Sequence, residues 1–373
     1  MHTLAAPTMT SIDQPNWPRP PAGLAEPLRL GSLELPTRFL MAPLAGYTNL
    51  PFRLAVRELG GVGLATTDLV NARALVRASR KTLELIDTCP ADRPMAVQIY
   101  GADPVEMADA AQWLENYGVS SVDINMGCPV HKVTRGGGGS ALMCSPTNTV
   151  RLVEKVAAAV RIPVTVKMRL GWDDSSWSAP YFARAFEQVG VAAVTIHGRT
   201  RDQGFGGDVR LAGIAAVVAA VKRLPIIGNG DVRAIHDAAR MFDATGCAAI
   251  AIGRGALLNP WLFAQLRHWQ DTGAPSPPAS YDQRLTFMAR HFHLLVAQRG
   301  ERFACLTFRK VANWYCKVLK PGRELQQRLI RLAAVADFDN MVQQLRDRGP
   351  ASAYDESRDV SFVRVPSGPV ERW

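Results

Sequence analysis

Short apolar runs alternate with longer amphipathic stretches between Arg38 and Arg254. Several runs are almost wholly apolar, such as 95–99, which is typical of parallel strands buried on both faces of a sheet. The stretches between them repeat apolar positions at helical spacing. The predicted strands are 38–43, 63–69, 95–100, 121–125, 164–169, 192–197, 225–229 and 248–253, and the predicted helices include 104–117, 147–160, 181–189, 211–221 and 232–242.

The order of these elements predicts an α/β fold, a (β/α)8 TIM barrel followed by a small all-helical domain. Eight strands with seven intervening helices, and one helix after the last strand, match such a barrel. A doubly wound open sheet would need a Gly-x-Gly-x-x-Gly turn after its first strand, and 41–46 supplies none. Asp103-Pro104 and Ser145-Pro146 each place a capping residue before a proline, which predicts two helix starts.

The domain organisation follows from shifts in composition. The first residues are rich in Pro, Ala and Thr and lack the basic start and apolar block of a secretory signal. A turn-rich segment ends the barrel, and helical periodicity at 303–319 and 324–345 follows it. The predicted units are a disordered N-terminal extension (1–29), the barrel (30–270), a linker (271–280), a helical domain (281–350) and a loose tail (351–373).

The charge of the chain is uneven. The net charge is +10, and residues 280–350 hold 13 Lys/Arg against 6 Asp/Glu, a difference of +7. A basic surface favours a polyanionic partner such as nucleic acid, although charge alone is equally consistent with a merely soluble basic face. Because no apolar run approaches the roughly 20 residues of a membrane span, we expect a cytoplasmic protein without a membrane partner, and a monomer.

Six cysteines are present without a Cys-x-x-Cys pair, so we predict no metal site. Most free cysteines are buried small hydrophobes. Cys128 differs, because Gly127 and Pro129 flank it where the chain must leave a strand. A thiol there is mostly protonated at neutral pH, so it could act as a general acid or as a nucleophile. His131 and Lys132 lie close enough in sequence to tune it.

The ends of the predicted strands should meet at one mouth of the barrel, where substrate and cofactor bind. Gly228-Asn229-Gly230-Asp231 and Gly253-Arg254 follow the last two strands. Glycines admit close approach of backbone N–H groups to an anion, and barrels often hold phosphate after these strands. We therefore expect a phosphate-bearing ligand there.

Lys167 ends another strand, and three interpretations of it stay open. It can form a Schiff base, hold an anionic cofactor or make a structural ion pair. His197 is equally ambiguous between a structural and a ligand-binding role, with its strand-end position favouring ligand binding.

Six motifs together resemble the tRNA-dihydrouridine synthase family, in its bacterial branch with Asn-Met-Gly-Cys-Pro. The resemblance extends over about residues 30–345. The motifs are Met41-Ala-Pro-Leu-Ala-Gly, Ala96-Val-Gln-Ile-Tyr-Gly, Asp123-Ile-Asn-Met-Gly-Cys-Pro, Lys167-Met-Arg-Leu-Gly-Trp, His197-Gly-Arg-Thr-Arg and Gly228-Asn-Gly-Asp.

The resemblance implies an FMN-binding barrel, NADPH as reductant and a helical domain that binds tRNA. Cys128 resembles the catalytic acid and Asn125 the residue at the target base. The implied cofactor-binding residues are Ala42, Pro43, Gln98, Lys167, His197, Asn229, Gly230, Asp231, Gly253 and Arg254. The expected tRNA-binding residues are Lys132, Arg169, Arg199, Arg201, Arg309, Lys310 and Lys317. One departure is the run after Arg201, where Phe205 lies and a Trp and an aromatic hydroxyl often found in the family are missing.

The implied reaction is reduction of specific uridines, with hydride to C6 from the flavin and a proton to C5 from Cys128. The base must leave its stack to react. Alternatives are an FMN-dependent reductase of a free pyrimidine or other small molecule, an RNA-binding protein without turnover, and a Schiff-base aldolase using Lys167.

Overall fold

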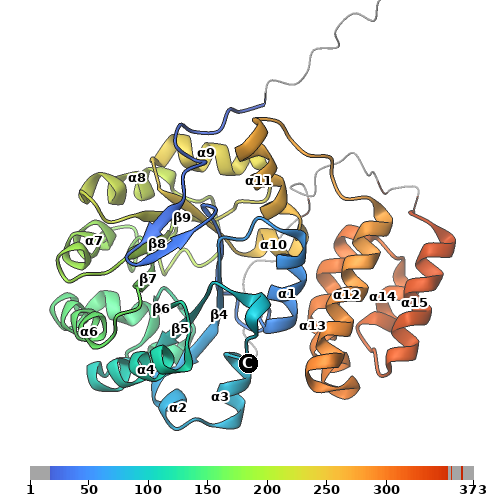
Figure 1. Ribbon diagram of the computed structural model, residues 1–373, viewed down its shortest axis with the longest axis horizontal. Coiled ribbons are helices and arrows are strands. Elements are labelled where there is room, and N and C mark those ends of the chain that lie inside the picture. The colour runs from blue at the N-terminus through green and yellow to red at the C-terminus, as the bar shows by residue number, and fades with distance from the viewer. Residues whose placement is uncertain (1–16, 352–353, 355–362, 364–373) are drawn as a thin grey trace, which may run out of the picture.

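The computed structural model describes residues 17–351, 354 and 363. Its centre is a closed barrel of eight parallel strands in the order β10-β3-β4-β5-β6-β7-β8-β9, which confirms the predicted TIM barrel (Figure 1). The strands are β3 (Phe39–Met41), β4 (Leu64–Asn71), β5 (Met95–Tyr100), β6 (Ser121–Met126), β7 (Val164–Arg169), β8 (Ala193–His197), β9 (Ile226–Asn229) and β10 (Ala249–Ile252).

Helices surround the barrel and fill its connections. They are α1 (Leu50–Leu59), α2 (Ala72–Val76), α3 (Arg80–Leu85), α4 (Pro104–Tyr117), α5 (His131–Thr134), α6 (Pro146–Ala159), α7 (Ala179–Gln188), α8 (Leu211–Ala220), α9 (Ile235–Thr245), α10 (Arg254–Leu258) and α11 (Leu262–Thr272), with 3-10 turns η1 (Pro90–Asp92) and η2 (Gly139–Cys144). Asp103 caps α4 as predicted, whereas Ser145 precedes α6 without a side-chain capping bond. Helix α9 begins later than predicted, because the Asp237 carboxylate accepts the backbone N–H groups of Arg233 and Ala234.

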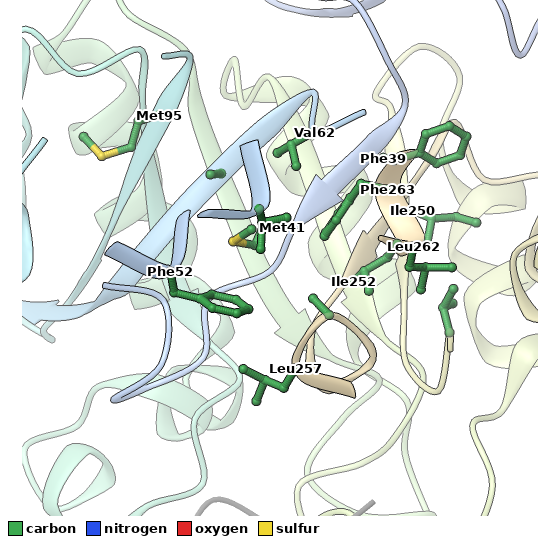
Figure 2. Packing of buried hydrophobic residues seen from close by; sticks show 14 of the residues in the cluster. Phe39, Met41, Phe52, Val62, Met95, Ile250, Ile252, Leu257, Leu262 and Phe263 are labelled. Carbon is green, nitrogen blue, oxygen red and sulfur yellow. The ribbon is translucent and has the colours of Figure 1, made fainter. Parts of the chain in front are cut away.

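Alternation along the strands separates two cores. Phe39 and Met41 of β3 belong to the large core beneath the helices, with Phe52 of α1 and Phe263 of α11 (Figure 2). Leu40 between them belongs to a smaller core inside the barrel. Opposite faces of one strand therefore build opposite sides of the barrel wall.

A hairpin of β1 (Leu28–Leu30) and β2 (Leu33–Leu35) joins this inner core through Leu28, Leu30 and Leu35. Residues 17–29 fall within the segment expected to be disordered, yet they pack against the barrel. Leu24 is buried, and the Trp269 indole N–H donates to the Pro18 carbonyl at 2.6 Å. Apolar side chains scattered among the prolines explain this packing. Residues 1–16 lie outside the described residues, as does the predicted tail 351–373 except 351, 354 and 363.

The chain after the linker is helical: α12 (Tyr281–Arg299), α13 (Glu301–Leu319), α14 (Arg323–Leu329) and α15 (Val335–Arg348). The stretch 324–345, predicted as one helical pattern, is thus two helices with a break at 330–334. Glu301 accepts the Val335 N–H and Arg309 donates to the Leu332 carbonyl, which satisfies backbone groups exposed by the break.

The helical domain packs on the barrel through α12 and α13. His291 of α12 lies against Phe52, with ring centroids 5.4 Å apart, and Arg290 pairs with Glu58 of α1 at 2.6 Å. Trp314 of α13 meets Tyr47, which follows β3, edge to face. Helix α13 therefore lies beside the mouth of the barrel. Among the described residues, no helix has the length and apolarity needed to cross a membrane.

Candidate active site at the barrel mouth

Neighbouring strands bring five predicted site residues to the barrel interior. Asn125 of β6 and Lys167 of β7 are register partners, and His197 of β8 pairs in register with Asn229 of β9. Gln98 lies opposite Asp123 one strand away. Parallel strands share one carboxyl end, so these side chains from separate parts of the sequence line one space.

Cys128 lies in the loop after β6 and is partly exposed. Its backbone is fixed, because the Cys128 N–H donates to the Asn125 side chain at 3.0 Å and its carbonyl accepts the Ser140 N–H at 3.0 Å. Gly139 closes the same loop at φ +60°, and a Cβ there would come within 2.6 Å of the Cys128 carbonyl oxygen. Burial raises the pKa of the Cys128 thiol, although the backbone N–H of Val130, and then the charges of Arg169 and Lys167, oppose the rise. The thiol therefore keeps its proton at neutral pH.

Lys167 and His197 share a positive environment. Burial, reinforced by Arg169, lowers the pKa of Lys167 to about 8, against the opposing pull of Asp123. Burial and then the charge of Arg169 hold the pKa of His197 well below 6.5. The histidine is therefore neutral, and it can both donate and accept a hydrogen bond.

Three guanidinium groups surround the Asp231 carboxylate after β9. Arg199 lies 2.5 Å from it, Arg254 3.6 Å and Arg233 4.0 Å. These four groups carry three positive charges against one negative charge. The excess is the electrostatic environment that a phosphate-bearing ligand requires, so the residues present fit such a group.

The glycines of this region serve packing as well. A Cβ on Gly228 would come within 2.8 Å of the Met241 sulfur, and one on Gly230, at φ +130°, within 2.5 Å of Val209. Gly253 has more room, with Leu44 3.4 Å from a built Cβ. The excess positive charge of the arginines around Asp231 therefore supports the predicted phosphate site more strongly than the glycines do.

Arg169 and Arg199, which are both expected to bind tRNA, are buried. Each residue is only 2% exposed. Arg169 donates to the carbonyl oxygens of Gly127, Thr200 and Gly204 at 2.7–2.9 Å. Arg199 donates to Asp231 and to the backbone of the loop after β8. Both guanidinium groups thus make their hydrogen bonds within the protein, mainly to backbone carbonyl oxygens of the mouth loops.

The other cations expected to bind tRNA lie nearer the surface. Lys132 and Lys310 are exposed, and Lys317 is partly exposed with its ammonium 6.0 Å from the Trp314 ring. Arg201 stacks on Trp172 at 4.6 Å. Arg309 differs, because it is partly buried and bonds the Leu332 carbonyl.

At the end of β3, Ala42 is buried and its N–H donates to the Ile252 carbonyl, while Pro43 is partly exposed. Asp68 of β4 was missed by the sequence reasoning. Its buried carboxylate accepts the Gly46 N–H at 2.6 Å and the Thr48 hydroxyl at 2.8 Å, which holds the loop after Pro43.

Phe205 is a second functional candidate that lacked an assigned role. Its ring lies 4.5 Å from the Arg254 guanidinium and 5.4 Å from that of Arg169, with His197 at 6.0 Å. It thus covers the cationic cluster with an apolar face. In the sequence, the position of Phe205 among glycines, in a loop at the barrel mouth, was the signal that it belongs to the site.

Comparisons with known proteins show the family and the fold. A family model described as "Dihydrouridine synthase (Dus)" matches residues 40–348. The chain is 36% identical to a "Probable tRNA-dihydrouridine synthase 1" of Synechocystis, covering 86% of this chain and 89% of that protein. It is 37% identical to "tRNA-dihydrouridine synthase B" of Xanthomonas campestris, covering 78% and 87%. Histamine dehydrogenase from Rhizobium shares the fold, with a TM-score of 0.51, 12% identity and coverage of 73% and 51%.

Proposed function

This chain belongs to the dihydrouridine synthase family, and on that premise we propose that it reduces the C5–C6 bond of specific uridines in tRNA to 5,6-dihydrouridine. The observation that carries the proposal is the Cys128 thiol. It lies at the end of β6 beside Asn125, on a fixed backbone, with a pKa that burial raises. A protonated, rigidly held thiol is suited to give a proton to C5 of the base.

The cofactor we propose is FMN, with NADPH as its reductant. Bound and reduced, FMN supplies the hydride that goes to C6 of uracil. Lys167 and neutral His197 would contact its polar atoms, and Gln98, Ala42 and Pro43 would lie beside its ring. The residues around its phosphate would be Asn229, Gly230, Gly253 and Arg254, with Asp231 orienting the arginine.

The cations of the site have separate tasks. Lys167, with a pKa near 8, keeps most of its charge at neutral pH and balances an anionic ligand. Arg169 and Arg199 hold the two mouth loops through backbone carbonyls. Phe205 and the loops around it would exclude water from the reacting atoms, which strengthens the electrostatic interactions inside.

We assign tRNA binding to the exposed and partly exposed cations beside the mouth. Lys132 lies on α5, directly after the loop that carries Cys128, and Arg201 follows β8. Lys310 and Lys317 lie on α13, which contacts the mouth through Trp314 and Tyr47. A basic surface next to the mouth suits a substrate whose base must be flipped into the barrel while its backbone stays outside.

The test is incubation of the purified protein with unmodified tRNA, FMN and NADPH, followed by mass mapping of the tRNA. We expect defined uridines to gain two hydrogens, and the protein to be yellow. Reduction of free uracil or uridine with unmodified tRNA left intact would favour a small-molecule reductase. A colourless protein that borohydride traps on a keto substrate through Lys167 would overturn the flavin assignment.

A further inference from the structure

Three side chains of β5 and β6 form a buried chain of hydrogen bonds that ends at Cys128. The Gln98 Nε2 donates to the Asp123 Oδ2 at 2.6 Å, and the Asn125 Nδ2 donates to the Gln98 Oε1 at 2.7 Å. The Asn125 Oδ1 then accepts the backbone N–H groups of Gly127 at 3.2 Å and Cys128 at 3.0 Å. We call Asp123, Gln98 and Asn125 the amide relay.

The direction of the amide relay is fixed from the Cys128 end. Backbone N–H groups can only donate, so the oxygen of Asn125 must face them. Its nitrogen then faces Gln98, which must present its own oxygen. The nitrogen of Gln98 therefore faces Asp123, and the residue at 123 must accept.

The contacts of Asp123 at the other end agree with this direction. The Asp123 Oδ1 also meets the Thr165 hydroxyl, at 2.6 Å. Burial raises the pKa of Asp123, against the pull of Thr165, Gln98 and Lys167. A proton taken up on Oδ1 would reverse only the bond to Thr165 and would leave Oδ2 as an acceptor. The relay thus keeps its direction whether Asp123 is ionised or carries a proton on Oδ1.

We propose that Asp123 is a positioning residue, which fixes through the amide relay both the backbone that carries the Cys128 thiol and the orientation of the Asn125 amide. The Asn125 oxygen accepts hydrogen bonds from two backbone N–H groups, and one of the two amide N–H bonds donates to Gln98. The second N–H can therefore serve a ligand. A single donor is complementary to a carbonyl oxygen of uracil. Recognition of uracil by Asn125 rests on the proposed function, whereas the hydrogen bonds of the amide relay do not.

The test exchanges the carboxylate and the amide. Gln98→Glu places two carboxylates in contact. The pair must then either share a proton or lose the hydrogen bond between positions 98 and 123. Asp123→Asn with Gln98→Glu restores one amide and one carboxylate in swapped positions, and the new carboxylate still accepts from Asn125. The readout is backbone hydrogen exchange at Gly127 and Cys128 in flavin-free protein.

At pH 8 we expect Gln98→Glu to speed that exchange about tenfold relative to native protein, because a buried hydrogen bond is lost. The excess should shrink at lower pH as the paired carboxylates take up a proton. Asp123→Asn alone retains an acceptor for Gln98 and should stay within about twofold of native, as should the double variant. Thr165→Val, which removes only the other partner of Asp123, is the matched control and should also leave the exchange unchanged.

Two outcomes overturn the proposal. One is unchanged exchange at Gly127 and Cys128 in Gln98→Glu. The other is a double variant no better than Gln98→Glu, in exchange or in yield of folded protein. Neither measurement involves tRNA or flavin, so a failure of the relay and a failure of dihydrouridine synthesis are told apart.

Discussion

The Nε of Arg169 donates to the carbonyl oxygen of Gly127 at 2.9 Å, immediately before the cysteine proposed as the acid. Its Nη1 donates to Thr200 and Gly204 in the loop after β8. One buried guanidinium thus joins the loops that follow β6 and β8. A residue predicted from the sequence to bind tRNA thus holds together two walls of the mouth.

Arg169→Lys keeps the positive charge but loses the planar fork that reaches three carbonyls. We expect the rate of dihydrouridine formation to fall about 10- to 100-fold, because the acid is less well placed, with tRNA affinity within about twofold of native. Single-turnover rates and filter binding measure the two. Arg201→Lys, at a partly exposed arginine that stacks on Trp172, is the control and should mainly weaken binding. Loss of affinity with unchanged chemistry in Arg169→Lys would instead identify an RNA contact.

Cys128→Ala should retain flavin and still oxidise NADPH, yet form dihydrouridine about 100- to 10,000-fold more slowly, because only the proton to C5 is lost. Flavin absorbance, NADPH oxidation and mass mapping of tRNA report each step. Cys144→Ala, at an exposed cysteine of η2, should behave as the native protein does. Loss of flavin from Cys128→Ala would show that the cysteine serves the cofactor site.

The pKa of Lys167 predicts how stability depends on pH. Its folded-state pKa of about 8 lies below the ordinary lysine pKa of 10.5, so the unfolded chain binds more protons between these values. The free energy of unfolding should therefore rise as pH increases from 8 to 10.5, by on the order of 1–3 kcal/mol from this group. Flavin-free Lys167→Met should lack that rise and be more stable at pH 7, as urea denaturation would show. An identical pH profile in both proteins would contradict the assignment.

Charge reversal on α13 should weaken tRNA binding. Lys310→Glu and Lys317→Glu remove positive charge beside the mouth, so the slope of log K against log salt should shrink by about 0.7 for each lost phosphate contact. Titrations at several salt concentrations measure it. Arg151→Glu, on exposed α6, is the matched control. If the α13 variants show the same salt slope as the native protein, tRNA binds to another surface.

The barrel could be predicted from the sequence because each strand is a buried apolar run between helical patterns, and the eight predicted strands match β3 to β10 within a few residues. Helix ends were less accurate where a side chain decides them, as Asp237 does for α9. The break before α15 depends on Glu301 and Arg309, which are distant in sequence. Such contacts leave no local pattern.

The residues of the candidate site were predicted from strand-end positions, and their roles came from the resemblance to the family. Strand-end position placed Asn125, Lys167 and His197 together. Burial is invisible in a sequence, so the 2% exposure of Arg169, a residue predicted to bind tRNA, did not follow from its pattern. Asp123 stood inside a recognised motif, and its spacing of two from Asn125 was a signal that both face the barrel interior.

The hairpin of β1 and β2 has a consequence for kinetics. Leu28, Leu30 and Leu35 join the inner core, so the end of the barrel opposite the strand carboxyl ends is filled. A nicotinamide and a flipped base would then have to use the same entrance, one after the other. We expect steady-state rates to give parallel double-reciprocal lines as NADPH and tRNA are varied, with each substrate inhibiting competitively against the other when in excess.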